Sequence, residues 1–541
     1  MCIIPSLSDA YHIMPSLFRR RNKSQVITNW NGTSQCHPSQ VHYPSTIDEI
    51  QSIIRQTRSD NKRLRIIGHR AHTWGSISMC NDGDVVVNLQ RFNKVLSVDR
   101  KNRTITAQAG CSLDDMMPTL EKERLALINM GEATEQTLGG VTATATHGSG
   151  GGPAPSLADS FSDQVVSYKV VDLTDKAAIH TVTREDDEVF DAFMVHLGLL
   201  GVVVEATLQL RSWFHLKWNI RDIGDVANLK LENMRRTYED VFSLTYTYFP
   251  GTNQVVEIVR GVTDNTHESG IESDIRDDFV NNLRQGNAVL LKCCPCCVEP
   301  HANIQKRALF SLNGNSDQWR KVLSQGNLWG GVNFTWNYDV EYAVPFAKTL
   351  EAIKIVRGVL EEKAKSMSTV VGIRFCRGSR GLLAPHFSTS PRDIFAYIEV
   401  QFSTKQLDPR IQMVLQNELS KLGGRAHWGK DNSTTFDQIS SNRLWPEANL
   451  NTFLDVKSQY DPDGLLGNYY TDKIFSRGQA GAITLVQNGE VTSIREVDDS
   501  DQEANPLAIM ALPGYATHDK GRIIPVHDGK ITRTIDQVAE C

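Results

Sequence analysis

The spacing of hydrophobic positions over the first 210 residues predicts a mixture of helices and strands. Isoleucines recur on one face of residues 44–57, where Thr46 and Glu49 have capping-box spacing, so a helix is expected there. Ser112 and Asp115 have the spacing of a second helix start. Runs of β-type residues predict extended segments at 65–68, 84–89, 95–109 (a hairpin), 165–173, 179–182 and 202–210. Together these elements indicate one compact α+β unit with a mixed sheet.

From Arg211 the pattern loosens, and long polar stretches replace regular spacing. Regular elements are expected again as strands at 340–342, 369–375 and 394–402 and as helices at 346–363 and 408–422. In the last of these, Asp408 is the expected cap and Pro409 the first helical residue. We therefore expect a second domain that ends near Ile474. Residues 475–541 hold short strand-like pieces with little material for a core.

The length of 541 residues allows three or four domains or two large ones, and the composition is that of a globular protein. Hydrophobic residues make up 40% of the 541 and charged residues 22%, and the net charge of −6 disfavours a nucleic-acid binder. The longest nearly apolar stretch, residues 192–204, is shorter than the roughly 18 residues that span a bilayer, so no transmembrane helix is expected. The N-terminus lacks the pattern of a secretory signal. A cytoplasmic location is expected, with a mitochondrial transit peptide as the alternative because Asp9 is the only acidic residue before Asp48.

Four of the ten cysteines form a cluster around Pro295: Cys293, Cys294, Cys296 and Cys297. Zinc sites usually space two cysteines by two to four residues and take their other ligands from elsewhere, whereas adjacent cysteines strain a single tetrahedron. A reduced, partly buried turn or a lipidated surface is therefore favoured over zinc. No metal is predicted.

Two glycine-containing segments are the first candidates for chemistry. Residues 141–152 read VTATATHGSGGG, where small side chains would let backbone N–H groups approach a pyrophosphate; the alternative is a flexible surface loop. Residues 68–74 read GHRAHTW directly after a predicted strand, which suits phosphate and ring contacts, although a lone histidine is more often structural. The chain has neither a Walker lysine nor Rossmann spacing. Two such segments in one domain favour an extended dinucleotide ligand.

The run NMGEATEQTLGGVTATATHGSGGG, residues 129–152, resembles the flavin-binding domain of the aldonolactone and alditol oxidases, which have the vanillyl-alcohol-oxidase fold. Further segments agree in order: residues 68–74, LGLLGVV at 197–203, HWGK at 427–430, and DPDG with NY at 461–464 and 468–469. The resemblance covers about residues 25–474. It implies an α+β flavoprotein with an FAD-binding domain of the PCMH type at 25–212 and a substrate or cap domain at 213–474, flanked by extensions at 1–24 and 475–541.

The resemblance implies FAD as cofactor, with the isoalloxazine between the two domains. His72 matches the histidine that bonds covalently to the flavin 8α-methyl in this family, but Gly68 lies one residue farther from it than usual, so His69 and noncovalent FAD stay as alternatives. Gly131 matches a small residue beside the face of the flavin that reacts with oxygen. The full set implied to bind the cofactor is Gly68, His69, Arg70, Ala71, His72, Thr73, Trp74, Gly131, Thr137, Gly140, Thr144, Thr146, His147, Gly148 and Val203.

Four residues are candidates for catalysis. Arg374 and Lys430 match cations that stabilise reduced, anionic flavin in such oxidases, although either could be a surface residue. Glu132 stands where alditol oxidases have serine, and Gly372 stands where they have glutamate, so a carboxylate has moved within the pocket or the substrate differs. His427 and Glu132 are both candidates for the proton acceptor.

These observations predict an FAD-dependent oxidase that removes hydride from a CH–OH carbon of a polyol, sugar lactone or related alcohol and passes the electrons to oxygen, giving hydrogen peroxide. The alternatives are a flavin oxidase of specialised metabolism with a repurposed pocket, a flavin-binding protein without turnover, and a scaffold without flavin. The expected partners are the small-molecule substrate and O2. The sequence leaves the substrate and the oligomeric state open.

Overall fold

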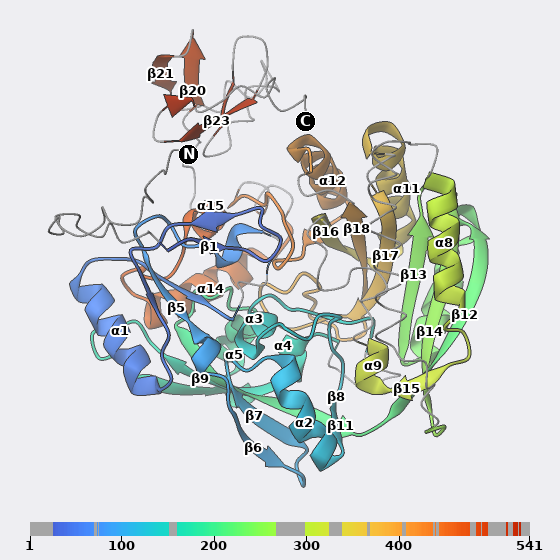
Figure 1. The fold of residues 1–541 in the computed structure, drawn as a ribbon, viewed down its shortest axis with the longest axis horizontal. Helices are drawn as coiled ribbons and strands as arrows, with labels where there is room; N and C mark the ends of the chain where they lie inside the picture. The colour runs from blue at the N-terminus through green and yellow to red at the C-terminus, as the bar shows by residue number, and fades with distance from the viewer. Residues whose placement is uncertain are drawn as a thin grey trace, which may run out of the picture. The chain divides into compact units, whose positions relative to one another are not determined.

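The computed structural model describes residues 25–69, 73, 75–150, 159–266, 298–323, 338–364, 368–402, 407–436, 439, 443–475, 483–487, 490–495, 515–517, 523–527 and 530–531 (Figure 1). The chain forms two compact units, one of Met1–Ser433 with Trp445–Asn468 and the other of Thr434–Leu444 with Tyr469–Cys541. Everything that forms the site described below belongs to the first unit. None of the helices in the described ranges has the length and apolar character that crossing a membrane requires.

The first half of the chain builds three sheets. The smallest pairs β1 with β2, a parallel sheet has the order β3-β5-β4, and an antiparallel sheet has the order β10-β9-β11-β7-β6, with β8 paired to β11. The strands are β1 (Ile27–Thr28), β2 (Gln35–Cys36), β3 (Gln40–His42), β4 (Leu64–Ile67), β5 (Val85–Asn88), β6 (Val95–Asp99), β7 (Thr104–Gln108), β8 (Leu125–Leu127), β9 (Val165–Val171), β10 (Ile179–Thr183) and β11 (Val202–Ser212). The helices are α1 (Ile47–Ser59), α2 (Leu113–Glu123), α3 (Leu138–Ala143), α4 (Phe161–Gln164) and α5 (Asp187–Phe193).

The helix starts follow the predicted capping residues. Thr46 Oγ1 accepts from Glu49 N at 3.2 Å, and α1 begins at the next residue rather than at residue 44. The Glu49 carboxylate accepts from Ser45 N at 2.6 Å. Before α2, Ser112 and Asp115 form both bonds of a capping box. The predicted extended segments of this half are confirmed within a few residues at each end.

A disulfide joins two buried cysteines of the first half. Cys36 ends β2, and Cys80 lies before β5; each is 2% exposed. The pair is separated by 44 residues. The sequence analysis did not predict this bond, because a pairing between two of ten cysteines cannot be deduced from spacing alone. The cluster Cys293–Cys297 lies outside the described residues.

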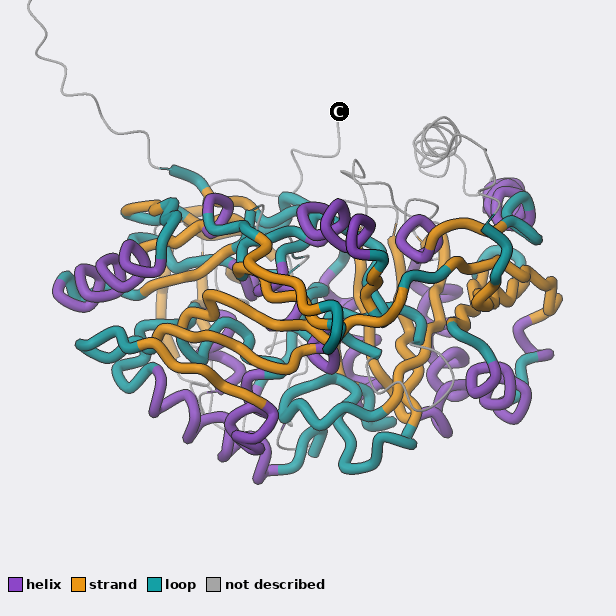
Figure 2. Tube along the Cα trace, turned by 90° about the horizontal axis from the view of Figure 1, so that it is seen from below, coloured by secondary structure: helices purple, strands orange, loops and turns teal. Residues whose placement is uncertain are grey.

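The second half of the chain is built on one antiparallel sheet with the order β15-β12-β14-β13-β17-β18-β16-β19. Its strands are β12 (His215–Asp225), β13 (Ser243–Phe249), β14 (Gln254–Thr263), β15 (Ser316–Gln318), β16 (Tyr338–Pro345), β17 (Ser368–Arg377), β18 (Ile394–Phe402) and β19 (Arg425–Ala426). The helices of this half and its tail are α6 (Leu231–Asp240), α8 (Val298–Phe310), α9 (Trp319–Leu323), α11 (Thr349–Val359), α12 (Pro409–Lys421), α14 (Glu447–Tyr460) and α15 (Tyr469–Phe475). Figure 2 shows helices on the outer side of the strands.

The loosened pattern after Arg211 is the main error of the sequence analysis. Three long strands, β12, β13 and β14, pair there and form three of the eight strands of the sheet. Leu216, Trp218 and Ile220 alternate with polar positions along β12, which is the period of two that marks a half-buried strand. The predicted strand β18 and the predicted cap Asp408 of α12 are both confirmed, with Asp408 Oδ1 accepting from Arg410 N at 2.9 Å.

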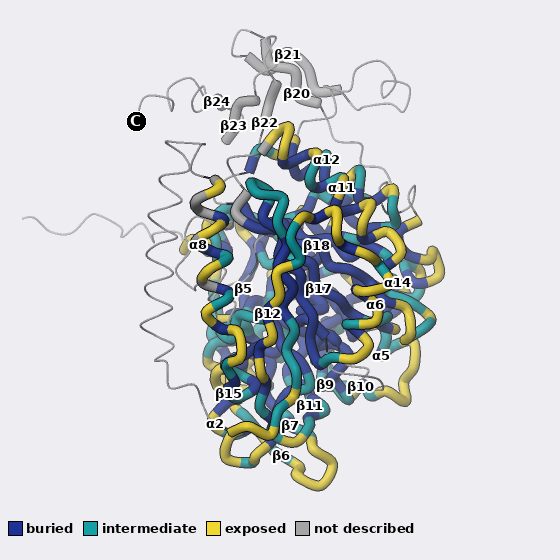
Figure 3. Tube along the Cα trace, turned by 90° about the vertical axis from the view of Figure 1, so that its right-hand side faces the viewer, coloured by how far each residue is buried: buried dark blue, intermediate teal, exposed yellow. Residues whose placement is uncertain are grey.

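The two faces of the central strands differ in chemistry. Apolar side chains on one face pack under α6, α11 and α12, as Val340, Ile373 and Ile398 do. The intervening positions point to the other face, so polar residues of β16, β17 and β18 share that side. Every residue of β18 is buried, and Figure 3 shows this strand and β17 in the interior. The buried polar face positions the candidate site.

In the second unit, short strands pair in the order β21-β20-β22-β23-β24. They are β20 (Ile483–Gln487), β21 (Glu490–Arg495), β22 (Tyr515–Thr517), β23 (Ile523–His527) and β24 (Lys530–Ile531). The expected strand-like pieces of the tail are thereby confirmed.

Candidate active site

A cavity of about 300 Å³ lies between the first half of the chain and the polar face of the large sheet. The first half contributes lining residues from β4 and the segment after it, from residues 131–147 and from residues 196–203. The sheet contributes Asp339, Glu341, Arg374, Glu399 and Gln401, and the segment after β19 contributes His427, Gly429 and Lys430. Segments far apart in the sequence thus form one pocket.

The cavity gathers most of the residues that the sequence analysis selected. All four predicted catalytic residues line it: Glu132, Arg374, His427 and Lys430. The predicted cofactor residues that line it are Gly68, His69, Thr73, Gly131, Thr137, Gly140, Thr144, Thr146, His147 and Val203. Gly148 is not among the lining residues, because it packs against Asn129; a Cβ at this position would lie 2.2 Å from Asn129 Oδ1. Arg70, Ala71, His72 and Trp74 lie outside the described residues.

The segment 141–150 is not a flexible surface loop, because every one of its residues is buried. Thr146 N donates to Val141 O at 3.0 Å, and Phe161 N donates to Thr146 O at 2.8 Å. Leu244 N donates to Ser149 O at 3.2 Å, which ties this segment to β13 of the second sheet. The small side chains therefore serve close packing at the junction of the two halves.

The walls fit a flat, polar-edged group such as a flavin dinucleotide. A Cβ on Gly68 would lie 2.3 Å from Thr137 Oγ1, and a Cβ on Gly131 would lie 3.0 Å from Thr146 Cγ2, so both segments approach closely only as glycines. Buried polar atoms at the sheet side have no hydrogen-bond partner among the described residues, including Asp339 Oδ1, Glu341 Oε2 and Arg374 Nε. Buried polar groups normally have partners, so these atoms are consistent with a polar ligand beside them.

The two predicted cations are held by carboxylates on the polar face. Arg374 Nη2 lies 2.5 Å from Glu341 Oε1 and 3.1 Å from Glu399 Oε2. Lys430 Nζ lies 2.9 Å from Asp339 Oδ2 and 2.7 Å from Glu399 Oε1. The interpretation of Arg374 and Lys430 as surface residues is therefore wrong: their side chains are 8% and 15% exposed.

Burial and charge act in opposite directions on the ionisation of this cluster. Burial lowers the pKa of Arg374, but Glu341 and Glu399 outweigh it and raise the pKa well above its usual range. Burial also opposes the charge of Glu341, yet Arg374 holds the pKa of that carboxyl well below its usual range. Burial raises the pKa of Asp339 to about 7 despite Lys430. Burial likewise raises the pKa of Glu132.

Two buried histidines complete the sheet side of the cavity, and each is held in one tautomer. His147 Nδ1 lies 2.8 Å from Gly148 O, and since a carbonyl only accepts, Nδ1 carries the proton. His427 Nδ1 accepts from Gly429 N at 3.0 Å, so its neutral ring carries the proton on Nε2. Burial lowers the pKa of both, to about 3 for His427. His427 is therefore a hydrogen-bond donor, which argues against it as the proton acceptor.

The same tautomer bears on metal binding. The ligand atoms of His147, Glu341 and His427 lie within 4.8 Å of one another. A proton on His427 Nε2 and an N–H bond on its Nδ1 leave that ring no lone pair for a metal. The cluster is better described as a polar network beside the cavity than as a metal centre.

Sequence reasoning missed Asp339, Glu341 and Glu399. They alternate with apolar residues inside strands β16 and β18, so each looks like an isolated polar position in a core strand. The available signal was the strand period itself, because carboxylates two residues apart must share a face. Tyr397 was also missed; its ring lies 3.7 Å from that of His147 between centroids.

Comparison with known proteins agrees with this site. Residues 38–181 match the family of the FAD binding domain, and residues 206–474 match the family described as D-arabinono-1,4-lactone oxidase. The L-gulonolactone oxidase of Mus musculus is 28% identical over 465 residues, which cover 84% of this chain and 99% of that protein. The L-gulono-1,4-lactone dehydrogenase of Mycobacterium tuberculosis is 26% identical, covering 83% of this chain and 99% of that protein.

Solved structures show the same fold at low sequence identity. A solvent-stable cholesterol oxidase superposes with a TM-score of 0.66 at 17% identity, covering 83% of this chain and 97% of that one. The xylooligosaccharide oxidase from Myceliophthora thermophila superposes with a TM-score of 0.60 at 14% identity, covering 83% of this chain and 94% of that one.

Fold and cofactor domain together define an FAD-dependent oxidoreductase of the vanillyl-alcohol-oxidase type, with an FAD-binding domain followed by a substrate or cap domain. Within this class, the chain belongs to the FAD-linked aldonolactone oxidase family. The expected fold, family and cofactor are thereby confirmed.

Proposed function

We propose that this protein is an FAD-dependent oxidase of a CH–OH carbon in a polyol, sugar lactone or related alcohol. Bound FAD would accept the hydride at N5 and deliver two electrons to O2, giving hydrogen peroxide. The observation that carries the proposal is the shared cavity, in which the predicted cofactor segments face Arg374 and Lys430. The relatives named as lactone oxidases and lactone dehydrogenases support the class of substrate.

In this proposal, the first half of the chain holds the cofactor and the sheet orients the substrate. The wall at Gly68, Gly131 and residues 137–147 would hold FAD, with His72 as the covalent attachment point. Arg374 and Lys430 would stabilise the negative charge that the flavin gains with the hydride, because fixed charges in a buried site need no reorganisation. We propose that the FAD-binding domain spans residues 25–212 and that the substrate or cap domain spans residues 213–474.

The proton of the substrate hydroxyl needs an acceptor at the same wall. His427 donates from Nε2 rather than accepts in its neutral tautomer, because its Nδ1 already accepts from Gly429 N. Glu132 lines the cavity, but burial raises the pKa of its carboxyl, so it accepts a proton only when ionised. We therefore favour Glu132 over His427 and expect activity to rise with pH as this carboxyl ionises.

We also propose that oxygen is the electron acceptor, which is a separate question because the relatives include both oxidases and dehydrogenases. Gly131 supports oxygen as the electron acceptor, because a Cβ at this position would lie against Thr146 and add a side chain to the cavity wall. We also propose a cytoplasmic location. A mitochondrial location is the alternative, because a relative from Arabidopsis thaliana is named a mitochondrial L-galactono-1,4-lactone dehydrogenase.

The test is peroxide release from a panel of uncharged polyols and lactones. Lys430→Met should lower kcat/KM by about 100-fold or more, the size expected for losing one preorganised charge. Lys421→Met is the matched control, because its side chain is 63% exposed and forms an ion pair with Glu418 at the end of α12. Bound flavin that no member of the panel reduces would favour a flavin-binding protein without turnover.

A further inference from the structure

Glu399 connects the two cations of the cavity. Its Oε2 lies 3.1 Å from Arg374 Nη2, and its Oε1 lies 2.7 Å from Lys430 Nζ. The side chain is 8% exposed and lines the cavity. Each carboxylate oxygen thus serves a different cation, one from β17 and one from the segment after β19.

A glycine on the neighbouring strand leaves room for this carboxylate. Gly372 of β17 pairs directly with Glu399 of β18. A Cβ on Gly372 would lie 3.6 Å from Glu399 Oε2, which is ordinary contact, so the carboxylate lies against the bare backbone of that residue. A longer acidic side chain at position 372 would reach the same place. At this point of the wall, the carboxylate therefore comes from position 399 of β18 and not from position 372 of β17.

The carboxyl groups near the two cations outnumber the cations. Arg374 is also held by Glu341 at 2.5 Å, and Lys430 by Asp339 at 2.9 Å, so each cation has two carboxylate partners. Glu132 lines the same part of the cavity. The nearby imidazoles of His147 and His427 add no positive charge, because burial lowers the pKa of each.

We propose that Glu399 is a specificity-determining residue that restricts the pocket to uncharged hydroxylated substrates and excludes alcohols that carry a carboxylate. This inference rests on the proposed function and names the substrate class of the same site. Hydroxyl groups donate hydrogen bonds to the carboxylate-rich wall, whereas a ligand carboxylate only accepts and is repelled. A lactone is therefore admitted, and the aldonate formed by its hydrolysis is rejected.

The test measures binding by the purified holoprotein and does not depend on turnover. An aldonolactone and its aldonate are titrated by calorimetry against the wild type and Glu399→Gln. In the wild type, the lactone should bind at least about tenfold more tightly than the aldonate. Removing the charge of Glu399 should tighten aldonate binding by about tenfold to 100-fold and leave lactone binding within about threefold.

Two further variants separate charge from structure. Gly372→Glu combined with Glu399→Gln returns a carboxylate from the neighbouring strand and should restore exclusion of the aldonate. Glu418→Gln, on α12 where the side chain is 42% exposed and pairs with Lys421, is the matched control and should leave both affinities unchanged. An unchanged ratio of the two affinities in Glu399→Gln would overturn the proposal, whether both affinities stay the same or both fall by the same factor.

A measurement on the wild type keeps the proposal testable if the variants do not fold. Burial raises the pKa of Asp339 to about 7, and the groups that face it are Lys430, Glu399 and Glu341. Aldonate stays ionised above about pH 5, so its affinity should rise as pH falls from 8 to 6 while lactone affinity stays flat. Equal pH dependence of both ligands would contradict the proposal. If no lactone or polyol reduces the flavin, the proposed function fails, but these binding ratios still decide the role of Glu399.

Discussion

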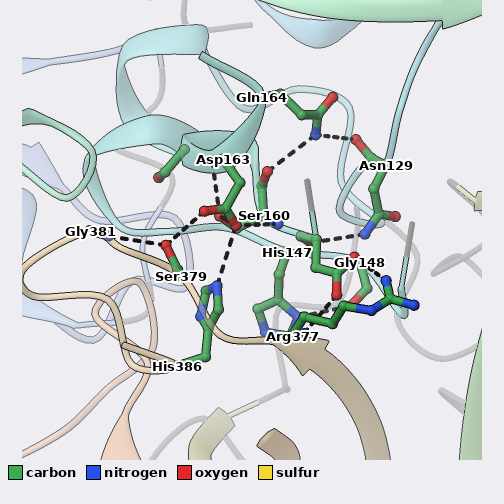
Figure 4. A network of polar contacts seen from close by, with 12 residues as sticks. Asn129, His147, Gly148, Ser160, Asp163, Gln164, Arg377, Ser379, Gly381 and His386 are labelled. Carbon is green, nitrogen blue, oxygen red and sulfur yellow. Dashed lines mark hydrogen bonds and ion pairs between the residues drawn. The ribbon is translucent and has the colours of Figure 1, made fainter. Parts of the chain in front are cut away.

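Asp163→Asn should destabilise the junction between the two halves of the chain. The Asp163 carboxylate, at the N-terminal turn of α4, accepts from Ser379 Oγ at 2.7 Å and from Ser160 Oγ at 2.6 Å. His386 Nε2 lies 3.4 Å from its Oδ2, and Figure 4 shows these side chains converging on the carboxylate. Ser379 and His386 belong to the segment that follows β17, so one buried anion joins two elements distant in sequence.

The expected loss of stability follows from the charged hydrogen bonds that asparagine cannot make. Hydrogen bonds to a charged group contribute about 1.5–3 kcal/mol each, and breaking a buried charged network costs about 3–5 kcal/mol. An amide keeps one acceptor and loses the charge, so we expect a loss of about 3 kcal/mol. Burial raises the pKa of Asp163, but His386 and Ser160 outweigh it and keep the pKa below its ordinary value. Its contribution is therefore present above pH 4 and lost as pH falls through the folded-state pKa.

Thermal unfolding followed by near-UV circular dichroism is the assay. Asp163→Asn should lower Tm by several degrees, and the difference from wild type should shrink as pH falls toward 3. Asp187→Asn is the control, since its side chain is 84% exposed and its ion pair to Arg380 lies at the surface. A Tm for Asp163→Asn equal to that of the control at pH 7 would refute this account of the junction.

Three other predictions concern the cofactor, the cavity and the disulfide. His72→Ala should release yellow colour to the supernatant on acid precipitation, whereas wild type should keep it in the pellet; colour that stays in the variant's pellet would move the attachment to another residue such as His69. Arg374→Lys should keep FAD bound but lower the rate of anaerobic flavin reduction by about 10–100-fold, because the flexible ammonium of lysine does not reproduce the fixed planar guanidinium that contacts Glu341 and Glu399; an unchanged rate in stopped-flow absorbance would argue against its role. Reduction of the Cys36–Cys80 bond should lower Tm, since closing a loop of 44 residues contributes about 4 kcal/mol in the chain-entropy view, and a Cys36→Ser/Cys80→Ser variant should show no response to reductant.

Local signals predicted much of the fold. The capping residues Thr46 and Asp408 lie where their helices begin, and β18 has the predicted limits, because caps and apolar runs act within a few residues. The strands after Arg211 were missed, although β12 alternates apolar and polar residues, because charged outer positions hide a one-sided strand.

The site was predicted from its cofactor segments and its two cations, but not from its carboxylates. Arg374 and Lys430 line the cavity as expected. Glu341 and Glu399 come together only through the pairing of β16 with β18, where they are direct partners. The register between strands depends on the whole sheet, so no local sequence pattern predicts which two carboxylates become neighbours.

The most direct test of the central claim is the visible spectrum of the purified protein, recorded without oxygen before and after addition of uncharged polyols and lactones. The account predicts an oxidised flavin spectrum that is bleached by at least one of these alcohols and that returns, with one equivalent of hydrogen peroxide, when air is admitted. Flavin that no alcohol bleaches, or protein that binds no flavin after reconstitution with FAD, would contradict it.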